Sequence, residues 1–551
     1  MSRTFDRIES EEPIEDWTGN NRFYHKASDE HFVMIRRDGR YFQRRYKLDS
    51  QGNQIYLFEV EIHFTIGSGN QERDYFHLSE TGELTQLPVV WYTTEQSWGI
   101  APGYDWSEHQ EFSRRVTYRC FFCHNAYPSL PEGADRYDAG LSLFPQNLPS
   151  GIDCERCHGP GETHVQAASK GESSQLVREK IVNPSRLDRR RQLDVCLQCH
   201  LSTTVAPTPG SILKAGRAVF SYRPGEPLVD YAVYFDYPAG TGHDDEFNLV
   251  HQGYRLSKSL CYRRSSMTCT SCHDPHQVPD NKRDFYNGKC AGCHDSAGCR
   301  LEPAAREVNG DDCVACHMPR RRTQDIVHVV LTDHNIQRRP GKNLMAPIRE
   351  MHNRKYGGAL SFYFPEQQDD FYLGLALVRG ADVRRGLQLL VQAISKEEPA
   401  SAEPYFYLGT GYATLGQRAR AIANYEKAIQ KDPQYAESHY NLGLVLLDAG
   451  DFTRSLEAFK QAISLQPAFA DAHAAAGLAE ARLGHPDRTI AHYREAVRLD
   501  PLNTVALNNL ALIEMQAGDR DRARAYFQQV LAIRPGDATA RDNIVKLRVR
   551  K

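Results

Sequence analysis

The sequence predicts a multidomain protein with a small β-rich N-terminal region, a middle region with little regular secondary structure, and an all-α solenoid at the C-terminus. Three observations predict this organisation. β-branched and aromatic residues dominate several segments before residue 95, a cysteine and histidine string recurs between residues 120 and 317, and prolines recur every 34 residues near the C-terminus. The expected boundaries are 1-115, 116-335, a linker at 336-368, and 369-551.

Residues 30 to 95 are expected to form a small antiparallel sheet. In the segment FVMIRRDGRYFQRRY, Asp38 and Gly39 separate two partly alternating runs, which is typical of a tight hairpin. IYLFEVEIHFTI is a second strongly β-prone segment, and SETGELTQLPVVWY supplies another turn and strand.

The middle region is built from short segments rich in Gly, Pro, Asp and Arg, so its side chains alone could hardly bury a stable core. It contains six copies of the string Cys-x-x-Cys-His. They consist of Cys120, Cys123 and His124; Cys154, Cys157 and His158; Cys196, Cys199 and His200; Cys269, Cys272 and His273; Cys290, Cys293 and His294; and Cys313, Cys316 and His317. Cys261 and Cys299 remain outside the strings, and a disulfide, free thiols or small buried apolar residues are all open for them.

Three kinds of chemistry compete for this array. Structural zinc needs four N or S ligands and has no need for a histidine after every second cysteine. A thioredoxin-like motif normally occurs once, in a βαβ setting. Covalent c-type haem explains every position, because two thiols on one helical turn form thioethers and the next residue presents its imidazole to the iron. We therefore predict six haems c, which would fill the core of the 198-residue stretch from Cys120 to His317.

A second histidine is expected to bind each iron on its other face. His276 follows the fourth string in TCTSCHDPH and emerges from the same turn as His273, so a neighbouring iron is its expected target, with a surface histidine as the alternative. His164 follows a Gly-Pro-Gly turn after the second string and is a similar candidate. His328 and His334 are six residues apart, roughly 20 Å on an extended strand, and would serve two different haems. His251 is a fourth candidate of this kind. Bis-histidine ligation without methionine predicts low-potential carriers.

The C-terminal region is expected to form helical repeats. Pro399, Pro433, Pro467, Pro501 and Pro535 are each 34 residues apart, and glycines and alanines keep the same interval. This spacing resembles the tetratricopeptide repeat (TPR), a helix-turn-helix unit. Four repeats are expected from near residues 401, 435, 469 and 503, with a degenerate one from 369 and a cap helix at the end.

Composition limits the partners. The net charge is -3, with 67 basic and 70 acidic residues, so no basic field indicates nucleic acid. The sequence contains no run of 18 apolar residues of the kind that would predict a transmembrane segment. The first thirty residues lack the apolar core of an export signal.

The chain resembles exported bacterial multihaem cytochromes c with a doubled CXXCH pattern, related to the tetrahaem carriers of ammonia oxidisers, here fused to TPRs. The resemblance is carried by CFFCHNAYP, CERCHGPGETH, HQGYRLSKSLCYRRSSMTCTSCHDPH and CVACHMPRRRTQDIVHVVLTDHNIQRR. It implies electron transfer through stacked haems and a periplasmic or otherwise exported location. Such proteins usually begin with an export signal and a further CXXCH string, so we expect in-frame upstream DNA to encode a signal and a seventh haem site.

Three functions are compatible with the sequence. The first is an electron carrier, with a redox partner protein docked on the TPR surface and no catalytic residue. The second is a haem oxidoreductase acting on a small nitrogen or sulfur compound at one iron with an open axial position. The third is a TPR scaffold that the cytochrome region tethers to a respiratory complex.

Overall fold

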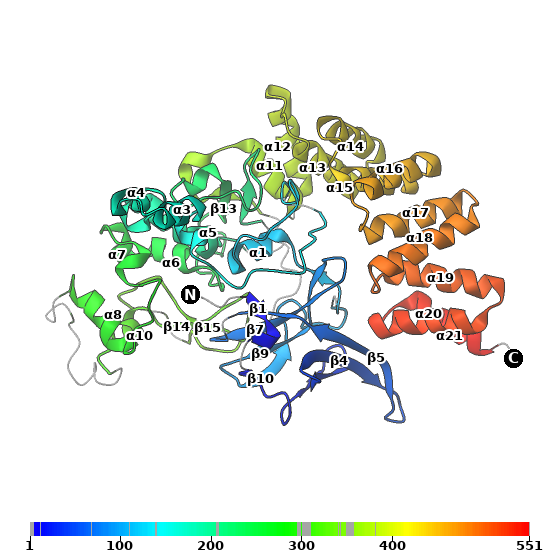
Figure 1. Ribbon diagram of the computed structural model, residues 1–551, viewed down its shortest axis with the longest axis horizontal. Coiled ribbons are helices and arrows are strands. Elements are labelled where there is room, and N and C mark those ends of the chain that lie inside the picture. The colour runs from blue at the N-terminus through cyan, green and yellow to red at the C-terminus, as the bar shows by residue number, and fades with distance from the viewer. Residues whose placement is uncertain are drawn as a thin grey trace.

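We analysed a computed structural model of the chain, which describes residues 5–10, 13–67, 69–109, 111–137, 140–204, 209–294, 299, 310–339, 341, 343–348, 358–380 and 382–549. Figure 1 shows three parts. The N-terminal strands lie at the bottom, the short helices of the middle region extend from the centre to the left side, and the C-terminal helices arch over the top and down the right side.

The N-terminal region is β-rich, as predicted. One antiparallel sheet has the order β2-β3-β4-β5, formed by Arg22–His25, Glu30–Arg37, Arg40–Leu48 and Gln54–Ile62. A second sheet has the order β1-β6-β7-β8-β11, formed by Phe5–Arg7, Phe64–Ile66, Glu72–Leu78, Leu84–Gln86 and Arg114–Arg115. Beside it, β9 (Val89–Tyr92) pairs with both β7 and β10 (Ser97–Ile100).

The predicted hairpin is confirmed at Asp38 and Gly39. Arg37 and Arg40 are paired, and the two residues between them have φ values of 53° and 78°. A two-residue turn with positive φ at both positions matches the right-handed twist of the strands it joins. The N-terminal region also contains an aromatic core, in which the rings of Trp17, Tyr75 and Trp98 contact one another.

The middle region contains short helices and strands. The helices are α1 (Tyr118–His124), α2 (Glu155–His158), α3 (Glu162–Ser169), α4 (Ser174–Glu179), α5 (Arg189–His200), α6 (Gln252–Lys258), α7 (Leu260–Arg263), α8 (Lys282–Ala291) and α10 (Cys313–His317). The strands are β12 (Ser211–Leu213), β13 (Ala232–Asp236), β14 (Arg320–Arg322), β15 (Val330–Thr332) and β16 (Ser361–Phe362). Short 3-10 turns lie at Ile8–Ser10, Pro184–Arg186, Leu228–Asp230, Cys269–Ser271 and Pro365–Gln367.

The side-chain core of the middle region is uneven. Around α1 and α5, aromatic residues that include Phe121, Phe122 and Tyr231 are buried together, so this part has more core than its composition predicts. In contrast, α8 and α10 contain no buried residue among those the structure describes. The lobe formed by α8 and α10 lies at the left edge of Figure 1. Its own side chains therefore contribute little burial to hold it together.

The C-terminal region is an all-α solenoid of paired helices, as predicted. The pairs are α11 (Asp370–Arg379) with α12 (Val383–Lys396), α13 (Glu403–Thr414) with α14 (Arg418–Lys431), α15 (Ala436–Asp448) with α16 (Phe452–Leu465), α17 (Ala470–Arg482) with α18 (Pro486–Leu499), and α19 (Thr504–Ala517) with α20 (Arg520–Ile533). Helix α21 (Ala538–Val549) follows as the expected cap.

Small residues let the helices of each pair approach closely. A Cβ atom added at Gly443 would lie 2.5 Å from the Phe459 ring, and one at Gly477 would lie 2.8 Å from the Tyr493 ring. The repeated glycine and aromatic positions of the sequence are thus contact points between the two helices of one repeat.

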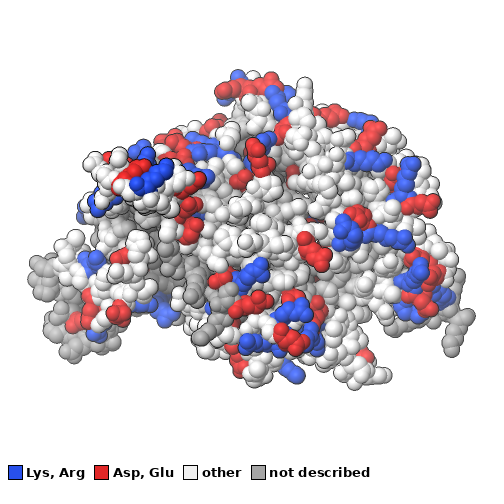
Figure 2. All heavy atoms as spheres, in the orientation of Figure 1, with Lys and Arg blue, Asp and Glu red and all other residues white. Residues whose placement is uncertain are grey.

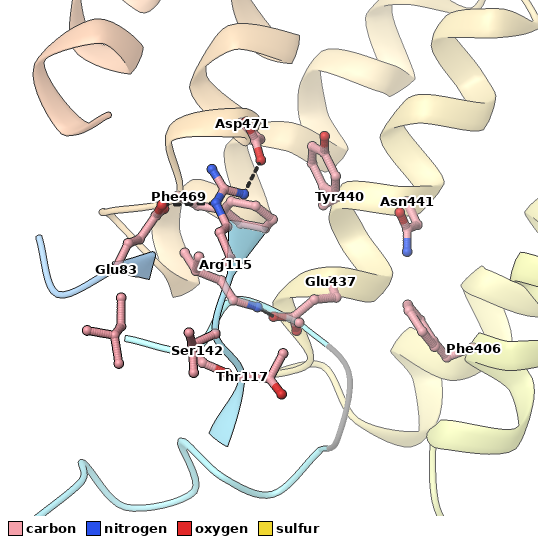
Figure 3. A pocket seen from close by; sticks show the side chains of 14 residues that line it. Glu83, Arg115, Thr117, Ser142, Phe406, Glu437, Tyr440, Asn441, Phe469 and Asp471 are labelled. Atoms are coloured by element: carbon pink, nitrogen blue, oxygen red, sulfur yellow. Dashed lines mark hydrogen bonds and ion pairs between the residues drawn. The ribbon is translucent and has the colours of Figure 1, made fainter. Parts of the chain in front are cut away.

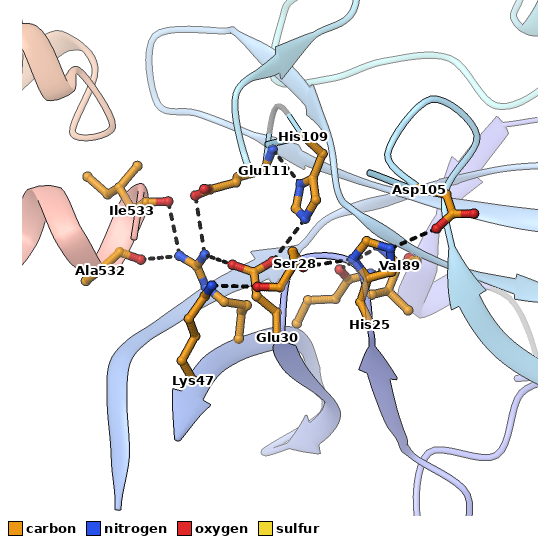
Figure 4. Close-up of polar contacts among 12 residues, drawn as sticks. His25, Ser28, Glu30, Lys47, Val89, Asp105, His109, Glu111, Ala532 and Ile533 are labelled. Carbon is orange, nitrogen blue, oxygen red and sulfur yellow. Dashed lines mark hydrogen bonds and ion pairs between the residues drawn. The ribbon is translucent and has the colours of Figure 1, made fainter. Parts of the chain in front are cut away.

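The solenoid packs against the rest of the chain at both ends. Near its start, Phe235 of β13 belongs to the same buried cluster as Leu375 of α11 and Tyr405 of α13. Near its end, the Arg45 guanidinium donates hydrogen bonds to the carbonyl groups of Ala532 and Ile533 at the C-terminus of α20 (Figure 4). A cation at this position is favoured by the unpaired carbonyls and the helix dipole.

A buried ionic network orients Arg45. Its Nη1 lies 2.6 Å from the Glu30 carboxylate and 3.3 Å from that of Glu111, and His109 lies 3.0 Å from Glu30 (Figure 4). Burial opposes ionisation of Glu30, but the interactions with His109 and Arg45 outweigh it and lower the pKa of this carboxyl to about 2. The network is therefore a structural joint between the β region and the solenoid.

Candidate functional site

Each CXXCH string, which we number as motifs 1 to 6 in chain order, forms about one helical turn. The strings of motifs 1, 2, 3 and 6 end helices α1, α2, α5 and α10 at the histidine. In motifs 2, 4 and 5, the backbone N–H of the histidine donates to the carbonyl of the first cysteine at 2.9 Å. Because residues three apart share one face of a helix, the two thiols of a string lie on the same side.

Local capping explains why the turns form here. Asp188 accepts a hydrogen bond from the Arg191 N–H at the start of α5, and Asp312 accepts bonds from Val314 and Ala315 at the start of α10. Aspartate at these positions satisfies the first free amide groups of a helix. Helices α5 and α10 are thus fixed at their starts by their own sequence, whereas α1 and α2 begin without a side-chain cap.

Motif 3 brings together motifs that are far apart in the sequence. Cys123 of motif 1, Cys199 of motif 3 and Cys269 of motif 4 all pack against one apolar cluster. Arg189 at the start of α5 donates to the Met267 carbonyl, just before motif 4, at 3.0 Å, and Gln198 of α5 donates to the Arg156 carbonyl in motif 2 at 2.9 Å. Motifs 1 to 4 therefore form one cluster around α5.

Motifs 5 and 6 form the lobe. Helices α8 and α10, which carry these motifs, pack against each other. The Asn287 side chain accepts a hydrogen bond from the Cys313 N–H at 2.9 Å and donates one to the Asp311 carbonyl at 2.9 Å, which ties α8 to α10. The six strings are thus brought together as a group of four and a group of two.

The motif histidines are oriented as iron ligands would need to be. Nδ1 of His158 bonds the Val182 carbonyl and Nδ1 of His317 bonds the Gln337 carbonyl, each at 2.8 Å. A carbonyl can only accept, so Nδ1 carries the proton and Nε2 keeps its lone pair. Metal-bound histidines are usually fixed in this way, and the paired thiols supply the thioether positions. The residues present therefore fit haem c.

Side chains that sequence reasoning missed orient two further motif histidines. Nδ1 of His200 lies 3.2 Å from Oε1 of Gln252, and Nδ1 of His273 lies 3.3 Å from the Tyr286 hydroxyl. Gln252 lies in the segment from His251 that carries the resemblance, and Tyr286 lies in no such segment, but no sequence pattern indicates either contact with a motif histidine.

Two of the predicted distal histidines lie opposite motif histidines. The ring centres of His276 and His158 are 6.0 Å apart with planes inclined by 19°, and those of His334 and His273 are 6.1 Å apart with planes inclined by 32°. Two imidazoles on opposite faces of one metal ion, each bonded at about 2 Å, would have ring centres roughly 6 Å apart. Nδ1 of His334 also bonds the Thr332 carbonyl at 3.1 Å, the orientation found for His158.

Burial keeps the relevant imidazoles neutral. Burial lowers the pKa of His334 to about 4 and that of His124 to about 4, with a smaller contribution from neighbouring histidines. The neutral form is the one that carries a lone pair for a metal.

The other three distal candidates differ. His164 has its Nδ1 bonded to the Val177 carbonyl at 2.8 Å, which leaves Nε2 as a donor atom for a metal. His251 is fully buried, with Nε2 3.0 Å from the Asn248 amide nitrogen and Nδ1 3.4 Å from the Glu246 carbonyl, so both ring nitrogens have protein partners. His328 is partly exposed, stacks on Tyr92 and lies 3.1 Å from Glu95. All three remain predictions.

Cys261 and Cys299 are both free thiols in the structure. Cys299 is exposed. Cys261 lies near the cysteines of motifs 4 and 5, with which it interacts electrostatically, and burial raises its pKa.

Within the described part of the chain, no group of three or more His, Cys, Asp and Glu side chains is arranged to hold a metal ion. No helix there is long and apolar enough to span a membrane.

A cavity of about 260 Å³ lies between the solenoid and the segment that leads into motif 1 (Figure 3). Phe406, Tyr440 and Phe469 line it from the solenoid, and Arg115 and Thr117 line it from the other side. The Thr117 hydroxyl lies 3.6 Å from the Cys120 sulfur, so the cavity adjoins the start of the motif array.

Arg115 links the two sides of the cavity. It bonds Glu83 at 2.9 Å, Asp471 at 2.8 Å and Asp500 at 3.4 Å. On the face shown in Figure 2, charges of both signs are interspersed.

Parts of the chain are similar to known proteins. A tetratricopeptide repeat model matches residues 372–436, 408–471, 440–504 and 474–538. The multiheme cytochrome MtrA of Shewanella baltica (strain OS185) is 26% identical over 225 residues, which cover 39% of this chain and 56% of that protein. The chain thus spans little more than half the length of this curated relative.

Solved structures are similar to part of the chain. The crystal structure of MamA is 25% identical, with a TM-score of 0.26, and covers 30% of this chain and 92% of its own. TTC0263, a thermophilic TPR protein of Thermus thermophilus, is 23% identical, with a TM-score of 0.27, and covers 33% of this chain and 98% of its own. The C-terminal third of the chain is a tetratricopeptide-repeat solenoid, fused to a region that is similar to a multihaem cytochrome.

Proposed function

We propose that the protein is a multihaem c-type cytochrome that transfers electrons through six covalently bound haems, one on each CXXCH string. The single observation that carries this proposal is the convergence of motifs 1 to 4 around α5, because haems held by these strings would lie close to one another. When bound, haem iron supplies reversible one-electron chemistry. Everything else is supplied by the chain, which attaches the haems, sets their spacing and orients their axial imidazoles.

Two axial pairs follow from the ring geometry. His158 and His276 would bind the iron of motif 2, and His273 and His334 would bind that of motif 4. The separations of 6.0 and 6.1 Å support both pairs. His276 would then bind a neighbouring iron from the turn that follows motif 4, so this turn links motifs 2 and 4.

The solenoid is proposed to dock a redox partner protein. TPR arrays are interaction modules, and solenoid side chains line a cavity close to one end of the motif array. Haem attachment of this kind is expected in an exported protein, which supports a periplasmic location.

The mass of the matured protein tests the proposal. Expression with a c-type maturation system should give a mass increased by six haems, and reduction should give sharp, wholly low-spin cytochrome bands. A colourless protein, or a mass without covalent haem, would refute the proposal. A high-spin component that binds nitrite or hydroxylamine would instead favour the haem oxidoreductase.

A further inference from the structure

The arrangement of the motifs bears on the path that electrons take. Around α5, Cys123 of motif 1, Cys199 of motif 3 and Cys269 of motif 4 pack against one apolar cluster. Arg189 at the start of α5 also donates to the carbonyls of Met267 and Tyr262, which precede motif 4, each at 3.0 Å. Motif 2 is held in the same cluster, since Arg156 donates to the Asn125 carbonyl at 2.8 Å and stacks over Phe122. These four motifs therefore have several routes among themselves.

The lobe is attached differently. Among the described helices and strands, α8 and α10 make extensive packing contacts only with each other. The lobe meets motif 4 in the described residues: the Tyr286 hydroxyl lies 3.3 Å from Nδ1 of His273, and the two ring centres are 5.7 Å apart.

Motif 6 also approaches motif 4. The backbone N–H of Asp333 donates to the carbonyl of Pro319 at 3.0 Å, two residues after His317. The next residue, His334, is the one whose ring lies 6.1 Å from that of His273. Both motifs of the lobe thus converge on the same member of the cluster.

We propose that motif 4, formed by Cys269, Cys272 and His273, is the gateway through which electrons pass between the cluster of motifs 1 to 3 and the lobe of motifs 5 and 6. This inference rests on the proposed electron-transfer function. Since electron tunnelling falls steeply with distance, the close contacts that the described residues make between the two groups decide the route. Motif 2 lies beside this route, although its position in the sequence is between motifs 1 and 3.

A flash-reduction experiment on the holoprotein tests the gateway. In a background with Cys261→Ser and Cys299→Ser, a ruthenium photosensitiser is attached at Ser129→Cys, an exposed position five residues after His124. A train of flashes, with a sacrificial donor present, injects electrons next to motif 1. The absorbance change then counts the haems that are reduced. The protein is kept dilute so that the count is complete before electrons pass between molecules.

Matched deletions of single haems give the readout. With Cys154→Ala and Cys157→Ala, all haems that remain should be reduced. With Cys269→Ala and Cys272→Ala, only the haems of motifs 1, 2 and 3 should be reduced, and those of the lobe should stay oxidised. If the lobe is still reduced in the motif 4 variant, or is lost in the motif 2 variant, the gateway is refuted.

If a variant that lacks one haem fails to mature, two single substitutions that keep every haem test the gateway instead. His334→Met should raise the potential of the motif 4 haem, because methionine ligation favours the reduced iron. Electrons would then stay on the motif 4 haem, and the rate at which the lobe haems are reduced should fall at least about tenfold. In His276→Met this rate should stay within about twofold of the wild-type rate. Equal slowing in both, or in neither, contradicts the gateway. The six-haem mass is measured separately, so its absence would refute the proposed function rather than the gateway.

Discussion

Arg45 of strand β4 donates a hydrogen bond at 3.0 Å to the carbonyl oxygen of Ile533, 488 residues later in the chain. The guanidinium is fully buried and also pairs with Glu30 and Glu111. The first sheet and the last repeat are therefore joined by a charged group without access to solvent.

Arg45→Met should loosen this joint. The substitution leaves the Glu30 and Glu111 carboxylates buried without their cation, and breaking a buried ion pair in this way costs about 3–5 kcal/mol. Proteolysis should then release helices α19 to α21 faster. Arg37→Met is the control, because Arg37 forms an exposed pair with Glu59 and its loss should cost at most about 1 kcal/mol. Equal protease resistance of Arg45→Met and wild type would contradict this role.

Gly443→Ala should destabilise the solenoid. The added methyl group would lie 2.5 Å from the Phe459 ring, and overpacking of this kind costs about 1–3 kcal/mol. Thermal unfolding followed by circular dichroism measures the change. Gly536→Ala is the matched control, because a Cβ there meets no atom within 4 Å, so its melting temperature should stay close to that of wild type. A similar shift for both variants would argue against the close contact.

The stability contributed by the ion pairs of Arg115 with Glu83, Asp471 and Asp500 should depend on pH. Burial raises the pKa of Glu83 to about 7, although Arg115 opposes the shift. The folded state therefore holds the Glu83 proton more tightly than the unfolded state, and stability falls as pH rises from the unfolded value towards 7. Relative to Glu83→Gln, the wild-type free energy of unfolding should drop by roughly 1–3 kcal/mol between pH 5 and pH 8.

Denaturant titrations at the two pH values measure this difference. Glu80→Gln, which changes an exposed neighbouring carboxylate, should track wild type at both values. A Glu83→Gln profile parallel to wild type would show that Glu83 is already ionised in the folded protein at pH 5.

His276→Ala should convert one haem to the high-spin state. Removal of this imidazole would leave the motif 2 iron with His158 alone, so electron paramagnetic resonance should show one new high-spin signal while the mass still shows every haem attached. His485→Ala alters a histidine of the solenoid that is bonded to Glu480, and should leave the spectrum unchanged. An unchanged spectrum in His276→Ala would remove the proposed pair.

Local patterns in the sequence predicted the parts of the fold that depend on neighbouring residues. The Asp38 and Gly39 turn, the 34-residue repeats and the helical turns of the CXXCH strings all follow from short-range geometry. The ring of His276 lies 6.0 Å from that of His158 and its side chain is 63% exposed, so its role as a ligand of a neighbouring iron stays a prediction.

The remaining features depend on contacts between distant segments. No pattern indicates that Gln198 contacts Arg156, that Tyr286 orients His273, or that Arg45 caps the end of α20. Such pairings are set by how the layers pack, and a sequence read along the chain does not contain them.

The buried cluster shared by Phe235, Leu375 and Tyr405 limits how this protein can be recombined. If a chimaera were made by dividing the chain at the end of the cytochrome-like region, each of the two pieces would carry part of this apolar surface exposed to solvent. A graft of the repeats onto another carrier therefore has to bring strand β13 and its neighbours along, or rebuild the face on which α11 and α13 rest.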